Sequence, residues 1–138
     1  MITIKENCKN ISEFNSLYDS VGWGAYDDEE IVQKALDNTF YSVSVYDDDK
    51  IIGYGRIVGD TICFLYIQDV MVRQEYQGKH IGTMIMTKLL EKVKEVKTKN
   101  PDVRVYLGAS KGRESFYERF GFVKRIDANL GYGMILMD

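Results

Sequence analysis

The sequence is poor in the residues on which disulfide frameworks and most zinc sites depend. Its 138 residues include one histidine, two cysteines and one proline. Cys8 and Cys63 lie far apart and form no CxxC pair, which excludes zinc sites built from clusters of cysteine and histidine. Two free, mostly buried thiols in a reducing cytoplasm are the expectation, in preference to a disulfide.

Long apolar runs are missing as well. The longest covers residues 62–67, whereas a membrane-spanning helix needs about 20 apolar residues, and no signal-peptide pattern opens the chain. We therefore expect no membrane span. The net charge of −3 argues against a general nucleic-acid binder. The length predicts a single domain over residues 1–138, large enough to bury a core of its own.

The periodicity of apolar residues predicts a mixed α+β fold. Alternation indicates strands and 3.6-residue spacing indicates helices. The expected strands are residues 1–6, 40–46, 51–58, 62–72, 103–107, 122–125 and 132–137. The expected helices are residues 10–21, a second helix opened by the acids at 27–30, and residues 81–97 and 113–120. This order predicts a mostly antiparallel sheet of six to seven strands with about four helices, and a parallel crossover over residues 67–107.

The segment that carries chemistry is residues 68–83, QDVMVRQEYQGKHIGT. A strand runs into a short polar loop, and the loop opens a long helix. Gly78 and Gly82 allow backbone amides to approach a ligand closely, and a helix N-terminus adds partial positive charge. Together with Lys79 these features predict an anion site suited to a phosphate or pyrophosphate.

The loop can be compared with known phosphate-binding patterns. The sequence contains neither the Walker string GxxxxGK[ST] nor the dinucleotide string GxGxxG, so a nucleotide-binding domain is disfavoured. It fits the first and last positions of the coenzyme A loop (Q/R)xxGx(G/A), as Gln77 and Gly82. His80 stands where the middle glycine is usual. If the loop requires a positive φ there, a non-glycine residue costs about 1–2 kcal/mol. If φ is negative the cost vanishes, and the imidazole is either beside a phosphate or simply exposed.

Two motifs together resemble the GCN5-related N-acetyltransferase (GNAT) family. One is VxVxxxYQGK at residues 70–79, and the other is FYERFGF at residues 116–122. The resemblance covers nearly the whole chain. Residues 67–72 and the YQGK loop resemble glucosamine-phosphate N-acetyltransferases. The Trp23 segment, Gly55-Arg56 and the ASK string at residues 109–111 are similar to plant-type arylalkylamine acetyltransferases, and the sequence does not choose between the two.

The resemblance implies that the chain binds acetyl-CoA and transfers the acetyl group to a primary amine. The backbone of residues 70–72 would pair with the pantetheine arm like an added strand, and amides of residues 77–83 would hold the pyrophosphate. The strands ending near Val72 and starting near Val103 would splay apart around the thioester. The implied coenzyme contacts are Val70, Met71, Val72, Gln77, Gly78, Lys79, His80, Ile81, Gly82, Thr83, Ser110 and Phe116.

Acetyl transfer also needs catalytic groups. The attacking amine must be neutral, although an alkylamine with a pKa of about 10.4 is mostly protonated at neutral pH. By resemblance, Tyr117 would give a proton to the departing thiolate, and a backbone N–H near Val70 or Met71 would stabilise the oxyanion. Asp69, an acid in the middle of a strand, is either a base for the amine or a structural hydrogen-bond acceptor.

The expected acceptor is a small-molecule amine, because the chain has no extra docking segment. Trp23, Tyr26 and Arg56 are the candidate acceptor contacts. Trp23 is either a core plug or a pocket wall, and Arg56 either meets an anionic part of the acceptor or pairs with a nearby acid. Two other functions stay open, namely an acetyl-CoA-binding sensor without turnover and acetylation of a protein amine. The resemblance also implies a homodimer through the last strands.

Overall fold

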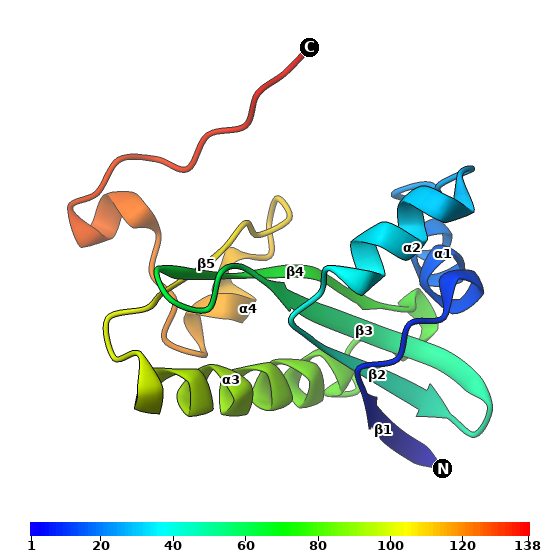
Figure 1. Cartoon of the computed structure of the whole chain (residues 1–138). Helices are drawn as coiled ribbons and strands as arrows, with labels where there is room; N and C mark the ends of the chain where they lie inside the picture. Colours follow the sequence, from blue (N-terminus) through cyan, green and yellow to red (C-terminus); the bar gives the residue numbers. More distant parts are fainter. The chain divides into compact units, whose positions relative to one another are not determined.

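The computed structural model describes residues 1–138 and is shown in Figure 1. The chain divides into two compact units, residues 1–106 and residues 107–138. The first unit holds most of the sheet and three of the helices. No helix is both long enough and apolar enough to cross a membrane.

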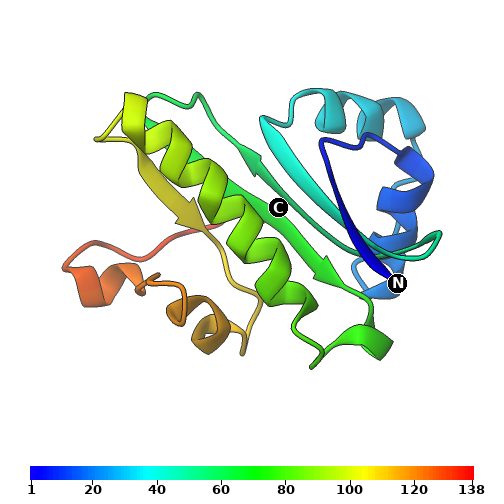
Figure 2. The same cartoon turned by 90° about the horizontal axis from the view of Figure 1, so that it is seen from below.

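The sheet has five strands in the order of the sequence. They are β1 (Ile2–Glu6), β2 (Tyr41–Asp47), β3 (Lys50–Val58), β4 (Phe64–Val72) and β5 (Arg104–Leu107). Each of the first four strands pairs antiparallel with the next. Between β4 and β5 the chain crosses over through a long helix, and Figure 2 shows the two arrows, green and yellow, pointing the same way. The expected α+β class and antiparallel first half are confirmed.

Four helices accompany the sheet, as expected. They are α1 (Ile11–Ser20), α2 (Glu29–Asp37), α3 (Ile81–Lys99) and α4 (Glu114–Glu118), with two 3₁₀ turns, η1 (Gln74–Tyr76) and η2 (Arg125–Ala128). The Asp28 side chain accepts a hydrogen bond of 2.9 Å from the Glu30 amide at the start of α2. The acids at residues 27–30 therefore include the helix cap, which is the position at which such residues stabilise a helix most.

The prediction of six to seven strands is wrong, because neither closing strand forms. Residues 122–125 run into η2, which ends on Asn129 with a φ of 59°, and this turn uses the backbone groups that a strand would need. Residues 132–137 form no strand either, and their apolar side chains are exposed. A continuous apolar run fits a buried strand only where neighbouring strands accept its backbone hydrogen bonds, and this unit contains none.

α3 covers one face of the sheet, and α1 and α2 lie on the other (Figure 1). The close approach of α3 depends on two glycines in β3. A Cβ atom on Gly53 would lie 2.9 Å from Ile85 Cδ1, and one on Gly55 would lie 2.7 Å from Ile85 Cγ2 and 3.1 Å from Leu89 Cδ1. Any larger residue at these positions would push α3 away from the sheet.

The face beneath α1 and α2 holds a second apolar cluster. Its buried members are Phe14, Leu17, Val32, Leu36, Tyr46, Ile51, Tyr54 and Met71. Both cysteines are free, as expected. Cys63 is exposed, which corrects the expectation of mostly buried thiols, because it precedes β4 in a turn outside the core.

Candidate active site

β4 contains a β-bulge at its centre. Tyr54 pairs with Met71 and Arg56 pairs with Gln68, so the single residue Gly55 on β3 stands opposite both Asp69 and Val70. Asp69 adopts a φ of 55°, a left-handed conformation that aspartate visits more readily than most residues. The extra residue of a bulge is left unpaired and the ladder is locally disrupted, at the place where an oxyanion donor was predicted, near Val70 or Met71.

The Asp69 side chain is fully engaged in hydrogen bonds. Oδ2 accepts 2.7 Å from Arg56 Nε, and Oδ1 accepts 2.8 Å from the Tyr18 hydroxyl and 3.3 Å from Gln68 Nε2. Its side chain is 1% exposed. Asp69 thus accepts three hydrogen bonds from protein side chains, as the second alternative for this residue, a structural acceptor, predicts. Burial in the first place, and then the Asp69 charge, raise the pKa of Tyr18 far above its ordinary value, so this hydroxyl remains a donor.

Arg56 is paired with an acid, which is the second of its two alternatives. Besides the bond to Asp69, its Nη1 donates 3.1 Å to the Ala35 carbonyl and 3.1 Å to the Thr39 hydroxyl. The side chain is 14% exposed. An anionic acceptor group would have to compete with these partners for the guanidinium.

Trp23 and Tyr26, two of the candidate acceptor contacts, form an aromatic wall with Tyr18. We call these three residues the acceptor wall. The Tyr18 ring centroid lies 5.3 Å from that of Trp23 and 5.3 Å from that of Tyr26. Trp23 is 45% exposed and Tyr26 47% exposed, so Trp23 is not a core plug. The Asn15 amide holds the backbone of Tyr26 through two bonds of 3.2 Å. Tyr18 thus connects the wall directly to Asp69.

The loop between β4 and α3 has the geometry of an anion site. Gly78 has a φ of 79° and His80, the residue before α3, has a φ of 65°. The loop therefore requires a positive φ at residue 80, which is a strained conformation for a non-glycine residue such as His80. Its side chain makes no capping bond, and the start of a helix without such a cap is a position at which anions bind.

The start of the loop is tied to the rest of the first unit. The Tyr76 hydroxyl donates 2.6 Å to Asp47 at the β2–β3 turn, and the ring lies 5.4 Å from Lys79 Nζ. The Gln77 amide donates 3.1 Å to the Val72 carbonyl. These contacts fix the loop relative to the end of β4.

The outer edge of β4 is long enough to receive an extended ligand. The Arg104 amide donates 3.0 Å to the Cys63 carbonyl, so β5 begins beside the start of β4. With four residues against the nine of β4, β5 reaches only about the middle of its neighbour in a parallel register. The stretch Val70–Val72, predicted to pair with the pantetheine arm, lies past that point.

The second unit carries the other predicted residues. Tyr117 lies in α4, with its ring centroid 5.0 Å from that of Phe116 and 6.5 Å from that of Phe122. Burial raises its pKa and the nearby Arg113 opposes this, so the phenol keeps its proton. The Ser110 carbonyl accepts 2.9 Å from the Arg113 amide. Tyr117, Phe116 and Ser110 belong to the second unit, whereas the bulge at Asp69 belongs to the first.

Sequence reasoning missed two features. One is the bulge at Asp69. Its only signal in the sequence is Gly55, a glycine within the strand that pairs with the one holding Asp69. The other is the partnership of Tyr18 with Asp69, because the residues lie 51 positions apart. No group of three histidine, cysteine, aspartate or glutamate side chains is placed to hold a metal ion.

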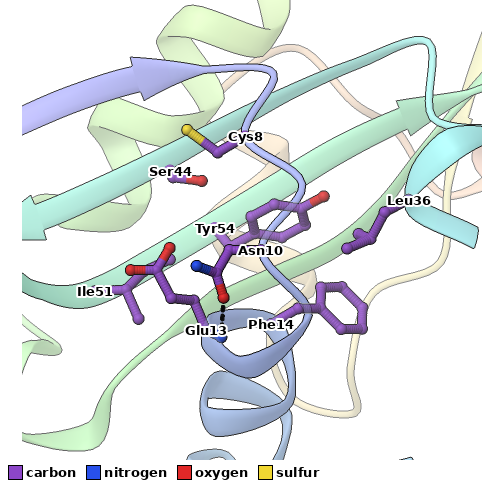
Figure 3. Close-up of a pocket in the computed structure, with 8 residues that line it drawn as sticks. All are labelled: Cys8, Asn10, Glu13, Phe14, Leu36, Ser44, Ile51 and Tyr54. Atoms are coloured by element: carbon purple, nitrogen blue, oxygen red, sulfur yellow. Dashed lines mark hydrogen bonds between the residues drawn. The ribbon is translucent and has the colours of Figure 1, made fainter. Parts of the chain in front are cut away.

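A small pocket lies elsewhere, in the core beneath α1 (Figure 3). Its lining residues are Cys8, Asn10, Glu13, Phe14, Leu36, Ser44, Ile51 and Tyr54. The Tyr54 hydroxyl is buried and has no hydrogen-bond partner. None of the predicted site residues lines this pocket, so it is separate from the candidate active site.

The chain matches known proteins over most of its length. Residues 14–133 match the family model described as "Acetyltransferase (GNAT) domain". The chain is 33% identical over 117 residues to the "Uncharacterized N-acetyltransferase ycf52-like" of Prochlorococcus marinus, covering 82% of this chain and 62% of that protein. The chain thus spans less than two thirds of the length of this relative.

Solved structures have the same fold. Protein SA2161 of Staphylococcus aureus, described as "Probable Acetyltransferase", is 28% identical with a TM-score of 0.86 over the full length of both chains. Glucosamine-6-phosphate N-acetyltransferase of Arabidopsis thaliana is 16% identical with a TM-score of 0.64, covering 100% of this chain and 97% of the other, which shows the fold alone. On the family match and the 33% identity to the first relative, the chain belongs to the GNAT family of acetyltransferases.

Proposed function

We propose that the protein transfers the acetyl group of acetyl-CoA to the primary amine of a small molecule. The observation that carries this proposal is the arrangement at the two ends of one short segment. A bulge that interrupts the strand ladder lies at Asp69, and a left-handed loop opens α3 at His80. The first suits a thioester oxygen and the second a pyrophosphate, which are the two parts of acetyl-CoA that most need hydrogen-bond donors.

The coenzyme contacts follow from this segment. The edge of Val70, Met71 and Val72 would pair with the amide groups of the pantetheine arm. The pyrophosphate would accept from amides of Gln77, Gly78, Lys79, His80, Ile81, Gly82 and Thr83. Ser110 and Phe116 of the second unit would flank the arm from its other side.

The reaction makes one bond and breaks one. The neutral amine attacks the thioester carbon, so that a C–N bond forms while the carbonyl oxygen gains negative charge beside the N–H groups near Val70 and Met71. Collapse breaks the C–S bond, and Tyr117 gives its proton to the thiolate. The ammonium of the tetrahedral intermediate loses its proton to solvent before this collapse, and the Tyr117 phenolate afterwards takes up a proton from solvent. Asp69 acts by holding the bulge, because both of its oxygens already accept hydrogen bonds.

The acceptor wall supports a small amine without a phosphate group. Trp23 and Tyr26 offer half-exposed aromatic faces, which suit an aromatic body or a cation. Arg56, the one basic candidate at the acceptor side, is held by Asp69, Ala35 and Thr39. An aryl-alkylamine fits these groups better than a phosphorylated amino sugar.

A thiol-release screen with acetyl-CoA tests the proposal. Its arms are aryl-alkylamines, polyamines, amino sugars with and without phosphate, and lysine-containing peptides. We expect the highest kcat/KM with an aryl-alkylamine and no preference for the phosphorylated sugar over its parent. Turnover confined to peptides would assign the protein-amine alternative. Binding of acetyl-CoA without release in any arm would assign the sensor alternative.

We also propose a homodimer formed through the C-terminal segment. The side chains of Met134, Ile135 and Leu136 are 96%, 82% and 94% exposed, and a symmetric pairing of this run with its copy would cover both runs at once. Light scattering on the full chain should give twice the monomer mass. A variant ending at Asn129 should give the monomer mass, and a monomeric full chain would contradict the proposal.

We further propose that the protein works in a reducing compartment such as the cytoplasm. Both thiols are free and Cys63 is exposed, which suits a compartment in which thiols stay reduced.

A further inference from the structure

The bulge in β4 holds a strained residue. Asp69 has a φ of 55°, and a non-glycine residue in this conformation is stable only where its surroundings over-determine it. The surrounding bonds are those of its side chain. Tyr18 on α1, Arg56 on β3 and Gln68 on β4 all donate to the carboxylate, at 2.8, 2.7 and 3.3 Å.

The carboxylate is also tied to α2 through Arg56. The Arg56 Nη1 donates 3.1 Å to the carbonyl of Ala35 in the last turns of α2 and 3.1 Å to the Thr39 hydroxyl just after that helix. Elements far apart in the sequence therefore converge on one backbone position. We call Tyr18, Arg56 and Asp69 the bulge clamp.

The clamp is costly to bury. The Asp69 and Arg56 side chains are 1% and 14% exposed, and taking such charges out of water offsets much of their attraction. Apolar side chains could fill this space at lower cost, so stability alone does not account for the pair. A role in positioning the backbone accounts for the pair, because a buried and fully hydrogen-bonded carboxylate restricts the backbone from which it projects.

We propose that Tyr18 and Arg56 are positioning residues, which hold the Asp69 carboxylate and so fix the β4 bulge in the conformation that directs its backbone N–H groups at the thioester. This inference rests on the proposed acetyl transfer and adds the residues that set the geometry of the oxyanion donor. Neither side chain touches the reacting atoms. They act through the φ of Asp69 and the path of the backbone to Val70.

The clamp also joins the two halves of the reaction. The Tyr18 hydroxyl binds Asp69, while its ring packs 5.3 Å from the rings of Trp23 and Tyr26 in the acceptor wall. A single side chain thus spans the acceptor wall and the bulge. The position of the amine and the position of the oxyanion donor are set by the same residue.

The test compares two tyrosine hydroxyls. Tyr18→Phe removes the bond to Asp69 and leaves the ring in the wall. Tyr46→Phe is the matched control, because the hydroxyl of the buried Tyr46 donates a hydrogen bond of 2.6 Å to Glu13. This bond joins β2 to α1 and does not involve β4. We expect kcat of Tyr18→Phe to fall about tenfold to a hundredfold, with the KM for acetyl-CoA unchanged. Tyr46→Phe should keep the wild-type kcat.

A second readout needs no turnover. The amide resonances of Val70 and Met71 in an NMR spectrum should shift in Tyr18→Phe and stay in place in Tyr46→Phe. Arg56→Lys, which keeps the charge and loses the bonds from Nε and Nη1, should shift the same resonances. Equal kcat in the two tyrosine variants, or unmoved Val70 and Met71 amides in both Tyr18→Phe and Arg56→Lys, would overturn the inference. Wild-type inactivity with every amine would refute the proposed acetyl transfer, and the amide shifts would still decide the clamp.

Discussion

Arg56 Nε donates a hydrogen bond of 2.7 Å to Oδ2 of Asp69, and this pair joins β3 to β4 at the point where β4 contains one residue more than its neighbour. The pair explains how an acid can occupy a buried strand position. It also limits what Asp69 can do, because both of its carboxylate oxygens already accept hydrogen bonds from protein side chains.

Asp69→Asn separates the two roles. Asparagine has the same shape, tolerates a positive φ and still accepts a hydrogen bond. We expect kcat/KM to fall by a similar factor at every pH from about 6 to about 9, because only the geometry of the bulge is disturbed. If Asp69 were the base, the rates of variant and wild type would converge as the pH approaches the amine pKa of about 10.4, where no base is needed. The pH profile of kcat/KM with one amine distinguishes the two.

Tyr117→Phe tests the proton donor. A general acid contributes about 10²–10⁴ in rate, so kcat should fall by that order while acetyl-CoA still binds. Burial raises the pKa of Tyr117 above its ordinary value of 10.0, so the phenol stays protonated up to that pH. The wild-type kcat should therefore show no decline from loss of this proton below about pH 10. Tyr66→Phe, near the start of β4 in the first unit, is the control. A Tyr117→Phe variant with wild-type kcat would exclude the role.

His80→Gly should stabilise the protein. The left-handed conformation costs a non-glycine residue about 1–2 kcal/mol, and glycine gives back part of this through its freer unfolded chain. We expect a net gain of about 1 kcal/mol in urea unfolding and an unchanged Kd for acetyl-CoA, because the ligands are backbone amides. His80→Val should lose stability instead. A clearly weaker Kd for His80→Gly would show that the imidazole contacts a phosphate.

Gly55→Ala tests the packing of α3 on β3. Its Cβ would lie 2.7 Å from Ile85 Cγ2, an overpacking that typically costs about 1–3 kcal/mol. Gly131→Ala is the matched control, because nothing lies within 4 Å of its Cβ position. Urea unfolding should show the loss only for Gly55→Ala. Equal stability of the two variants would mean that α3 does not need the glycine.

Much of the fold was predictable because its signals are local. The antiparallel strands β2, β3 and β4 alternate or are β-branched, α3 follows 3.6-residue spacing, and the glycines after β4 mark the loop. The bulge was not predictable, because a period-two pattern looks the same with or without an extra residue. The contacts of Asp69 with Tyr18 and Arg56 were not predictable either, because these residues lie far from Asp69 in the sequence. Neither Tyr18 nor Arg56 shows in the sequence which carboxylate it binds.

The closing strands failed for a different reason. Residues 132–137 have the composition of a buried strand. A strand forms only beside a pairing strand, however, and no local pattern indicates whether such a partner exists. Composition predicted the strands correctly where the pairing strand is the next one in the sequence, as in β3 and β4. It failed at the C-terminal segment, where no such neighbour follows in the sequence.

The measurement that tests the account most directly is a single turnover. Protein saturated with acetyl-CoA is mixed with an excess of the best aryl-alkylamine, and free thiol and acetylated amine are counted at intervals after quenching. The account predicts that the two products appear together, in equal amounts and only when amine is present. Thiol release without acetylated amine, or tight acetyl-CoA binding with neither product for any amine, would contradict it.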